Sequence, residues 1–155
     1  MELTYKTIIN VPQAFAFEKA TDFARFEREG FGKLSPFEPR SEIKAPGIGA
    51  RWRTSSEFQG RPRRFSLELF KLDGPEAMVL GNKSEKYDIE AHFLFKEIGE
   101  EETEFTFHLD AKAQSITAKL ILQTIQLARG RIEKSMQTEF EKMALNMEEA
   151  FDESR

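Results

Sequence analysis

One charged side chain, that of Arg129, falls within a stretch of large apolar residues near the carboxyl end of the chain. At about 100° per residue on a helix, it lies near the middle of the stripe formed by Ile125, Ile132, Met136 and Phe140. A charge on a buried face is costly unless it is paired or reaches water. Because a guanidinium offers a planar fork of donors, Arg129 predicts an anchor for a ligand carboxylate, phosphate or enolate. The alternatives are an ion pair within the chain or a side chain that extends to solvent.

Polar residues also occur on the apolar faces of strand-like segments. Thr54, Ser56 and Tyr87 are expected to hydrogen-bond a ligand in an otherwise apolar pocket, or to be satisfied by backbone or water. Trp52, on the same face, is expected to plug the core or to stack on a ligand. With the apolar residues that face them, these side chains form the predicted ligand-binding set, which is Trp52, Thr54, Ser56, Phe65, Leu67, Tyr87, Ile89, Phe93, Phe105, Phe107, Ile125, Arg129, Ile132 and Met136.

Two other groups of polar residues favour surface roles. His92 and His108 fall on polar faces, and because no third ligand accompanies them, we expect surface histidines and no metal site. A group of arginines around one hairpin predicts either a solvated hairpin paired with Glu57 and Glu68 or a surface for anionic lipid or a protein partner. These are Arg51, Arg53, Arg61, Arg63 and Arg64. The sequence has no Ser–His–Asp arrangement, phosphate loop or His-Glu-x-x-His motif, so no catalytic residue is assigned and no cofactor is expected.

The element that must carry Arg129 is a helix. Residues 115–151 contain no proline, and large apolar residues recur in them at steps of three and four. This spacing predicts one continuous helix of roughly 55 Å, with Ser115 as its cap. Gly130 weakens such a helix by about 1 kcal/mol relative to Ala and predicts a kink or a close backbone approach. A helix of this length needs a broad surface to cover.

The segments upstream of this helix favour a sheet. Period-two patterns predict strands at residues 3–11, 50–58, 65–69, 77–82, 87–95 and 105–111, with a shorter paired segment at 41–44. Pro12 opens a short helix, and Asp22 caps a second one that stops at Gly30. Hairpin connections make the sheet antiparallel, and only the last helix can cover its apolar face. The predicted fold class is α+β, with a curved antiparallel sheet of about seven strands wrapped over a long C-terminal helix and two short helices after the first strand.

Composition narrows the class of protein further. The 155 residues suit a single domain over residues 1–155, and the absence of cysteine excludes disulfides and thiolate metal sites. A net charge of −4 argues against general nucleic-acid binding. No secretory signal and no run of roughly 20 apolar residues occurs, so we expect a soluble, cytoplasmic protein without integral membrane association. Fifteen Phe against two Tyr and one Trp indicate a Phe-rich core or a cavity lined by rings.

Several motifs resemble those of a known superfamily. They are Ile8-Ile9-Asn10-Val11-Pro12-Gln13-Ala14-Phe15, leading to Asp22-Phe23, and then Gly47-Ile48-Gly49-Ala50-Arg51-Trp52-Arg53. With the order of elements, they resemble the START-like, Bet v 1-like superfamily (SRPBCC), and most of all its bacterial polyketide cyclase/dehydrase and lipid-transport group. The resemblance covers essentially the whole chain and implies a helix-grip fold with a deep apolar pocket between the sheet and the long helix. Where that group often has a proline followed by a tryptophan, residues 26–31 read Phe-Glu-Arg-Glu-Gly-Phe.

Three functions are compatible with these features. The preferred one is binding or transport of a small hydrophobic ligand, such as a lipid, isoprenoid or polyketide-like molecule, under the long helix. The second is a cyclase/aromatase or dehydratase-type enzyme in which Arg129 and Tyr87 polarise or protonate a polyketide-like substrate. The third is a stress or cochaperone-like adaptor that binds a protein partner through the arginine-rich hairpin or the second short helix.

Overall fold

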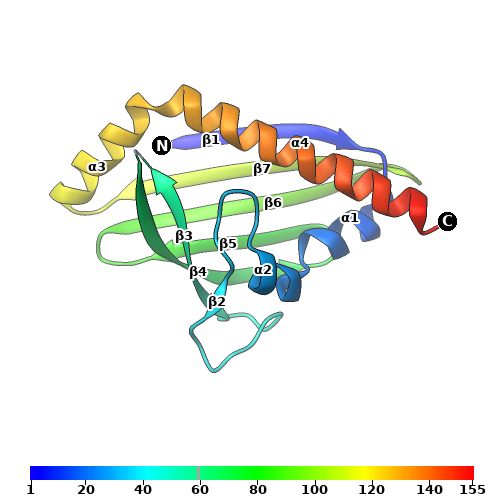
Figure 1. The fold of residues 1–155 in the computed structure, drawn as a ribbon, viewed down its shortest axis with the longest axis horizontal. Coiled ribbons are helices and arrows are strands. Elements are labelled where there is room, and N and C mark those ends of the chain that lie inside the picture. The colour runs from blue at the N-terminus through cyan, green and yellow to red at the C-terminus, as the bar shows by residue number, and fades with distance from the viewer. Residues whose placement is uncertain (59) are drawn as a thin grey trace.

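The computed structural model describes residues 1–58 and 60–155. Within them, seven strands form one antiparallel sheet in the order β1-β7-β6-β5-β4-β3-β2, and four helices accompany it (Figure 1). The strands are β1 (Glu2–Ile9), β2 (Glu38–Pro39), β3 (Arg51–Phe58), β4 (Arg61–Asp73), β5 (Ala77–Lys83), β6 (Tyr87–Gly99) and β7 (Glu102–Ala113). The helices are α1 (Gln13–Ala20), α2 (Phe23–Glu29), α3 (Ile116–Leu127) and α4 (Arg129–Glu153). The predicted α+β class, with a curved antiparallel sheet and two short helices after the first strand, is confirmed.

Local sequence signals place the short helices correctly. Pro12 is the N-cap of α1, and the side chain of Asp22 caps α2 by accepting a hydrogen bond from the backbone N–H of Arg25 at 3.2 Å. Gly30 ends α2 with a φ of 74°, where a Cβ would collide with the carbonyl oxygen of Leu34. Only glycine tolerates both this backbone conformation and this close approach.

The predicted pairing at residues 41–44 is wrong. The short strand β2 pairs with β3 two residues earlier, through Glu38 and Pro39. Ser41 instead forms a local turn: its hydroxyl donates to the carbonyl of Ile43 at 2.7 Å and accepts from the backbone N–H of Arg51 at 2.9 Å. A side chain that bonds to nearby backbone groups competes with the hydrogen bonds of a strand ladder. This competition explains why residues 41–44 do not form the predicted strand.

The C-terminal segment is two helices instead of one. The chain turns at Ala128, which is both the C-cap of α3 and the N-cap of α4, and Figure 1 shows α3 bending away from α4 toward the end of β7. Apart from the two neighbours of Gly130 in the chain and the nearby backbone of its own helix, no atom of the described residues lies within 4 Å of a Cβ placed on Gly130, so the expected close approach is absent. The break falls two residues earlier, where the backbone N–H of Ala128 bonds to the carbonyl of Ile125 at 2.9 Å. None of the helices described here is long and apolar enough to cross a membrane.

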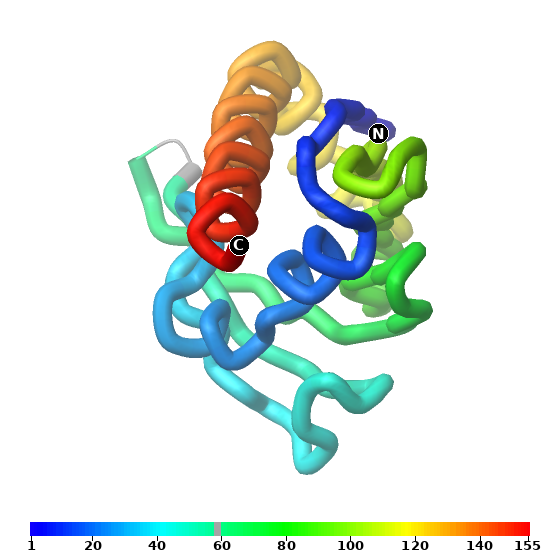
Figure 2. The backbone as a smooth tube through the Cα atoms, turned by 90° about the vertical axis from the view of Figure 1, so that its right-hand side faces the viewer, coloured from blue at the N-terminus to red at the C-terminus, as the bar shows by residue number. Residues whose placement is uncertain are grey.

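The apolar core is concentrated at one end of the space between α4 and the sheet. Phe140 of α4 is at its centre, with ring centroids 4.8 Å from Phe107, 5.2 Å from Phe105 and 5.6 Å from Tyr5. Figure 2 looks at this end and shows α1 lying between α4 and the strands. We call this cluster the closed end; its buried members are Ile9, Val11, Ala16, Ala20, Phe95, Phe105, Phe107, Phe140, Ala144 and Met147.

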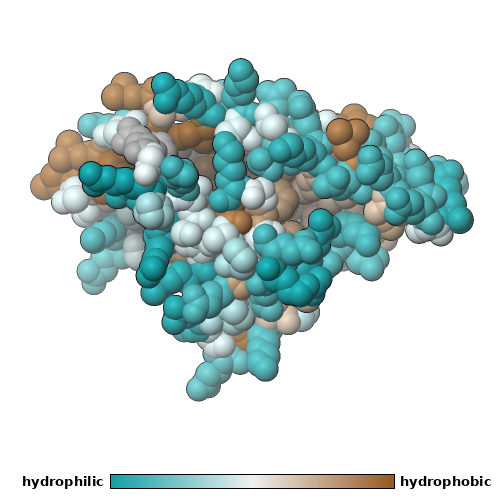
Figure 3. Space-filling model, viewed as in Figure 1, coloured by the Kyte–Doolittle hydropathy of each residue, from teal (hydrophilic) through white to brown (hydrophobic). Residues whose placement is uncertain are grey.

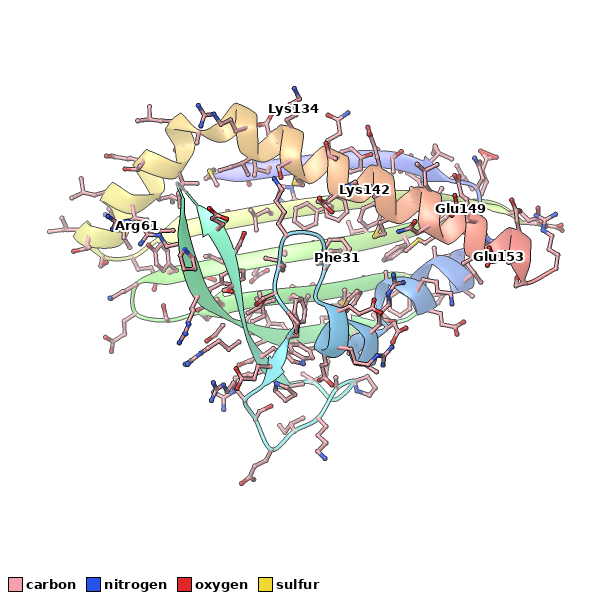
Figure 4. The ribbon with its side chains drawn as sticks, in the orientation of Figure 1. Phe31, Arg61, Lys134, Lys142, Glu149 and Glu153 are labelled. Carbon is pink, nitrogen blue, oxygen red and sulfur yellow. The ribbon has the colours of Figure 1, made fainter. Side chains whose placement is uncertain are left out.

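A second cluster fills the space under α2. Trp52 of β3 stacks on Phe23 with ring centroids 5.3 Å apart and packs beside Phe37 and Leu69. Phe31, from the segment after α2, points under α4 (Figure 4) and links the two clusters through a contact of 6.1 Å between its ring centroid and that of Phe140. The two short helices therefore seal one side of the molecule.

Candidate functional site

The predicted ligand-binding residues divide into a packed group and an open group. Trp52, Thr54 and Phe105 are 1%, 2% and 0% exposed. The indole N–H of Trp52 donates to the Glu27 carboxylate at 2.9 Å, and the Thr54 hydroxyl donates to the carbonyl of Ser35 at 2.7 Å. Their polar atoms are satisfied by the chain itself, as the alternative interpretation of these residues stated. They are core residues that support the site from behind.

The open group lies between the sheet and the C-terminal helices, at the opposite end from the closed end. Alternation along β4 and β6 directs Phe65, Leu67, Tyr87 and Ile89 inward, yet all four remain half-exposed. Ile125 and Ile132, on the sheet-facing sides of α3 and α4, are half-exposed as well. We call the inner surface formed by these six residues the open end. Figure 3 shows hydrophobic surface set back between α4 and the β3–β4 hairpin, which is the side from which this region is reached.

Three further members of the predicted set connect the two ends. Phe93 and Met136 are half-buried and pack against the residues of the closed end, and Phe107 is one of its buried members. The ring of Phe93 lies 5.1 Å from that of Phe107 and 6.4 Å from that of Phe140, measured between centroids. These three residues therefore form the wall at which the open end stops.

The side chain of Arg129 does not lie in the interior, where a ligand anchor was expected. Its side chain is 44% exposed and runs away from the apolar stripe. One guanidinium nitrogen donates to the carboxylate of Glu133 at 2.6 Å, and another donates to the carbonyl of Glu2 on the edge strand β1 at 2.7 Å. The position lies on the stripe by its angle, but at the first turn of α4 a long side chain reaches both solvent and the sheet edge. The alternative, pairing within the chain, is the one observed.

The structure instead places two other arginines beside the open end. The inward alternation of Leu69, Leu67 and Phe65 along β4 continues to Arg63 and Arg61. Arg63 lies opposite the half-buried Ser56 in the register, and Figure 4 labels Arg61 where β4 leaves the hairpin. Both arginines are exposed, and neither forms an ion pair with a carboxylate of the described residues.

Sequence reasoning missed this distinction within the arginine cluster. It treated Arg51, Arg53, Arg61, Arg63 and Arg64 as one group, whereas the register places Arg51, Arg53 and Arg64 on the outer face of the hairpin. The signal was present, because the period-two pattern of β4 extends past Phe65 toward the turn. Polar groups in the inward register around the open end thus include the hydroxyls of Ser56 and Tyr87 and the guanidinium of Arg63.

Two surface concavities of the molecule lie outside the predicted set. One, of about 510 Å³, is lined by Arg40, Ser41, Glu42, Ile43, Gly49, Arg51 and Glu68. The other, of about 410 Å³, lies at the turn between α3 and α4 and is lined by Thr124, Leu127, Ala128, Gly130 and Arg131. Neither concavity contains a residue of the predicted ligand-binding set. The binding role of that set therefore stays a prediction.

The histidines lie on the outer face of the sheet, as predicted. His92 and His108 face each other across β6 and β7 with ring centroids 6.3 Å apart. A ring nitrogen of His92 lies 2.9 Å from the Glu90 carboxylate, and a ring nitrogen of His108 lies 2.8 Å from the Thr4 hydroxyl. Hydrogen bonds from Lys83 and His92 hold the pKa of Glu90 below its ordinary value. In the described part of the chain, no three His, Cys, Asp or Glu side chains are grouped so as to hold a metal ion.

Comparison with known proteins supports the fold. No protein-family model matches the chain, and no curated protein matches its sequence. Among solved structures, TTHA0849 from Thermus thermophilus is similar with a TM-score of 0.68 at 19% identity, over 94% of this chain and 98% of that one. The ZhuI aromatase/cyclase from Streptomyces sp. R1128 is similar with a TM-score of 0.68 at 12% identity, over 96% and 93%. A START superfamily protein from Mycobacterium smegmatis is similar with a TM-score of 0.58 at 12% identity, over 88% and 97%.

These similarities define the class to which the architecture belongs. The chain shares the fold of these structures, which is the helix-grip arrangement of a curved antiparallel sheet and a C-terminal helix that the sequence predicted. At such low identities the likeness concerns the backbone arrangement. Ligand and activity must be argued from the residues of this chain.

Proposed function

We propose that the open end binds a small hydrophobic molecule, such as a lipid, an isoprenoid or a polyketide-like compound. One observation carries the proposal: inward-facing apolar residues of β4, β6, α3 and α4 remain half-exposed, while the same layers are fully packed at the closed end. Removing apolar surface from water contributes about 25 cal/mol per Å². A ligand that covers Phe65, Leu67 and Ile89 gains this stabilisation without rearranging the core.

The polar groups beside this surface favour a ligand with one polar end. Ser56 and Arg63 lie opposite each other where β3 and β4 approach their hairpin, and Tyr87 begins β6 on the same inner face. A hydroxyl or acid group of the ligand would find its hydrogen-bond partners there, while the apolar body would lie against β6 and the helices. Arg63 takes the role first predicted for Arg129.

Binding is favoured over catalysis. An enzyme of the cyclase or dehydratase type needs polar groups that converge on its substrate. Arg129, which was the expected electrophile, is held by Glu133 and by the carbonyl of Glu2. The buried hydroxyl of Thr54 is bound to Ser35. The reaction first considered therefore loses its expected electrophile, and the proposal is one of binding.

Mass spectrometry of compounds extracted from the natively purified protein tests the proposal. The decisive variant is Ile89→Lys, which places a charge on the inner surface, and its matched control is Leu94→Lys on the outer face of the same strand. Ile89→Lys should lower the amount of bound compound at least tenfold, a change that corresponds to about 1.4 kcal/mol. Leu94→Lys should leave it unchanged, because Leu94 is 40% exposed on the far face of the sheet.

A hydrophobic naphthalene sulfonate dye provides a second measurement if the natural ligand is lost on purification. The wild-type protein should enhance the fluorescence of the dye, and Ile89→Lys should reduce this enhancement while thermal unfolding remains cooperative. Absence of both a co-purified compound and dye binding would refute the proposal. Equal loss in Ile89→Lys and Leu94→Lys would show that the open end is not where the ligand binds.

A further inference from the structure

Helix α3 exposes large apolar side chains on the face turned away from the sheet. Ile116, Leu120 and Leu127 are 80%, 59% and 91% exposed, and Ile121, on the flank between them and Ala118, is 47% exposed. At about 100° per residue, Ile116, Leu120 and Leu127 fall within about 40° of one another, opposite the buried Ala118. Figure 3 shows the resulting hydrophobic patches at the end of the molecule occupied by α3.

This pattern is unusual for a helix on a protein surface. In Ile116–Leu127 the only charged residue is Lys119. Gln123 falls on the outer side as well, but three of the largest apolar side chains of α3 share that side with it. The next helix behaves normally, because α4 carries charged residues at its outward positions throughout Arg129–Glu153. Large apolar side chains that gather on an exposed face mark a surface that binds another structure. The outer side of α3 therefore predicts a partner that the chain itself does not supply.

Basic residues accompany this apolar face. Lys119 is exposed on α3, and Arg131 and Lys134 are exposed in the first turns of α4, whose first turn contains no acidic residue. Lys134 points away from the sheet (Figure 4). The concavity of about 410 Å³ at the turn is lined by Leu127 and Arg131, so apolar and cationic groups meet in the same recess. The local charge is thus opposite in sign to the net charge of −4 of the chain.

We propose that α3 and the turn at Ala128 form a docking surface for a lipid bilayer that contains anionic lipids. The exposed Ile and Leu side chains enter the boundary between headgroups and acyl chains, while Lys119, Arg131 and Lys134 face the phosphates. Twelve residues are too few to span a bilayer, so the helix lies in the plane of the interface. This surface goes beyond the proposed ligand site, and its binding to a bilayer does not require a ligand.

A second copy of the chain is a weaker candidate for the occupant. A two-fold interface brings the same patch of both subunits together, so it would gather the cations that flank α3 from both copies without supplying an anionic surface to complement them. A stable dimer also buries roughly 800 Å² per partner, which exceeds what one face of a twelve-residue helix exposes. An anionic bilayer complements both the apolar stripe and its basic border.

Flotation of the full chain with vesicles tests the docking surface. The wild-type protein should bind vesicles of phosphatidylcholine and phosphatidylserine, and it should bind vesicles of phosphatidylcholine alone at least tenfold more weakly. Leu120→Glu should reduce binding to the mixed vesicles at least tenfold. Its control is Leu145→Glu on α4, because Leu145 has the same exposed fraction of 59% but lies away from α3; this variant should bind like the wild type.

The charge contribution is tested separately with Arg131→Gln. This variant should weaken binding to the mixed vesicles severalfold and leave binding to phosphatidylcholine vesicles unchanged. Sedimentation velocity on the same samples identifies the other occupant. A wild-type dimer that Leu120→Glu converts to a monomer, or wild-type protein that does not float with the mixed vesicles, would overturn the proposal. Vesicle binding that persists in Leu120→Glu would do the same.

Discussion

The two ends of the space between α4 and the sheet differ in how completely they are filled. At the closed end, Phe105 and Ile9 are 0% exposed, and Phe140 contacts rings from both the sheet and the segment after α2. At the open end, Ile89, Ile125 and Ile132 point into the same space and remain half-exposed. Strands β6 and β7 run through both ends, so the sheet alone does not cause the difference.

The covering elements explain the contrast. Helix α1 packs against β6, β7 and α4 and closes one end, whereas the other end is covered by α3, which packs only against β7 and α4 among the stronger contacts described. The bend at Ala128 turns α3 toward the end of β7 and away from the β3–β4 hairpin (Figures 1 and 2). One end of the same sheet therefore provides stability, and the other provides accessible apolar surface.

The largest expected effect is a difference in stability between the two ends. Phe140→Ala should lower the free energy of unfolding by about 3–5 kcal/mol, because it removes a fully buried ring from the centre of the closed end. Ile132→Ala, at the open end of the same helix, should lower it by only about 1 kcal/mol, since this side chain is already half-exposed. Urea unfolding measures both values. Equal losses would mean that the two ends are packed alike.

Replacing a small residue by a larger one tests the same difference in packing, because it asks whether extra volume can be accommodated. Ala16→Leu, at the closed end, should cost about 1–3 kcal/mol, because the side chain of Ala16 is 0% exposed and no room is left around it. Ala91→Leu, on the inner face of β6 and half-exposed, should change the free energy of unfolding by less than about 1 kcal/mol. Thermal unfolding of the two variants provides the comparison, and a strongly destabilised Ala91→Leu would contradict an accessible inner surface.

The smallest expected effect concerns the outer face of the sheet behind the open end. The folded-state pKa of Glu90 is lowered, so its contribution to stability is fully present above the ordinary pKa of a glutamate and is lost as the pH falls through the folded-state pKa. Glu90→Gln should therefore cost less than about 1 kcal/mol at neutral pH, because its carboxylate is 35% exposed, and less still at about pH 3. Urea unfolding at both pH values measures this difference, and ligand binding at the inner face should not change. A constant difference across this pH range would assign the effect to something other than the carboxylate.

Much of the fold could be predicted because it rests on local signals. The alternation of Tyr87 to Phe95 gives β6, the cap at Asp22 starts α2, and Gly30 ends it. The candidate site was harder to predict, because it depends on which groups the ends of long side chains reach in the folded chain. The angle of Arg129 on the stripe is correct, but its length and its position at the first turn let it reach Glu133 and Glu2. Gly130 indicated a kink, but the place of the break at Ala128 and the division into two helices were not predicted, since the apolar spacing of three and four continues across it.

The sequence by itself determined the class of fold, the order of the longer strands along the chain and the inner faces of β3, β4, β6 and β7. These features follow from hydrophobic periodicity and from caps, which act over a few residues. Only the tertiary structure decided that α1 fills one end while α3 leaves the other accessible, and that Arg63 instead of Arg129 stands beside the inner surface. Such outcomes depend on the direction in which helices cross the sheet. That direction is set by contacts between residues far apart in the chain, which no local pattern encodes.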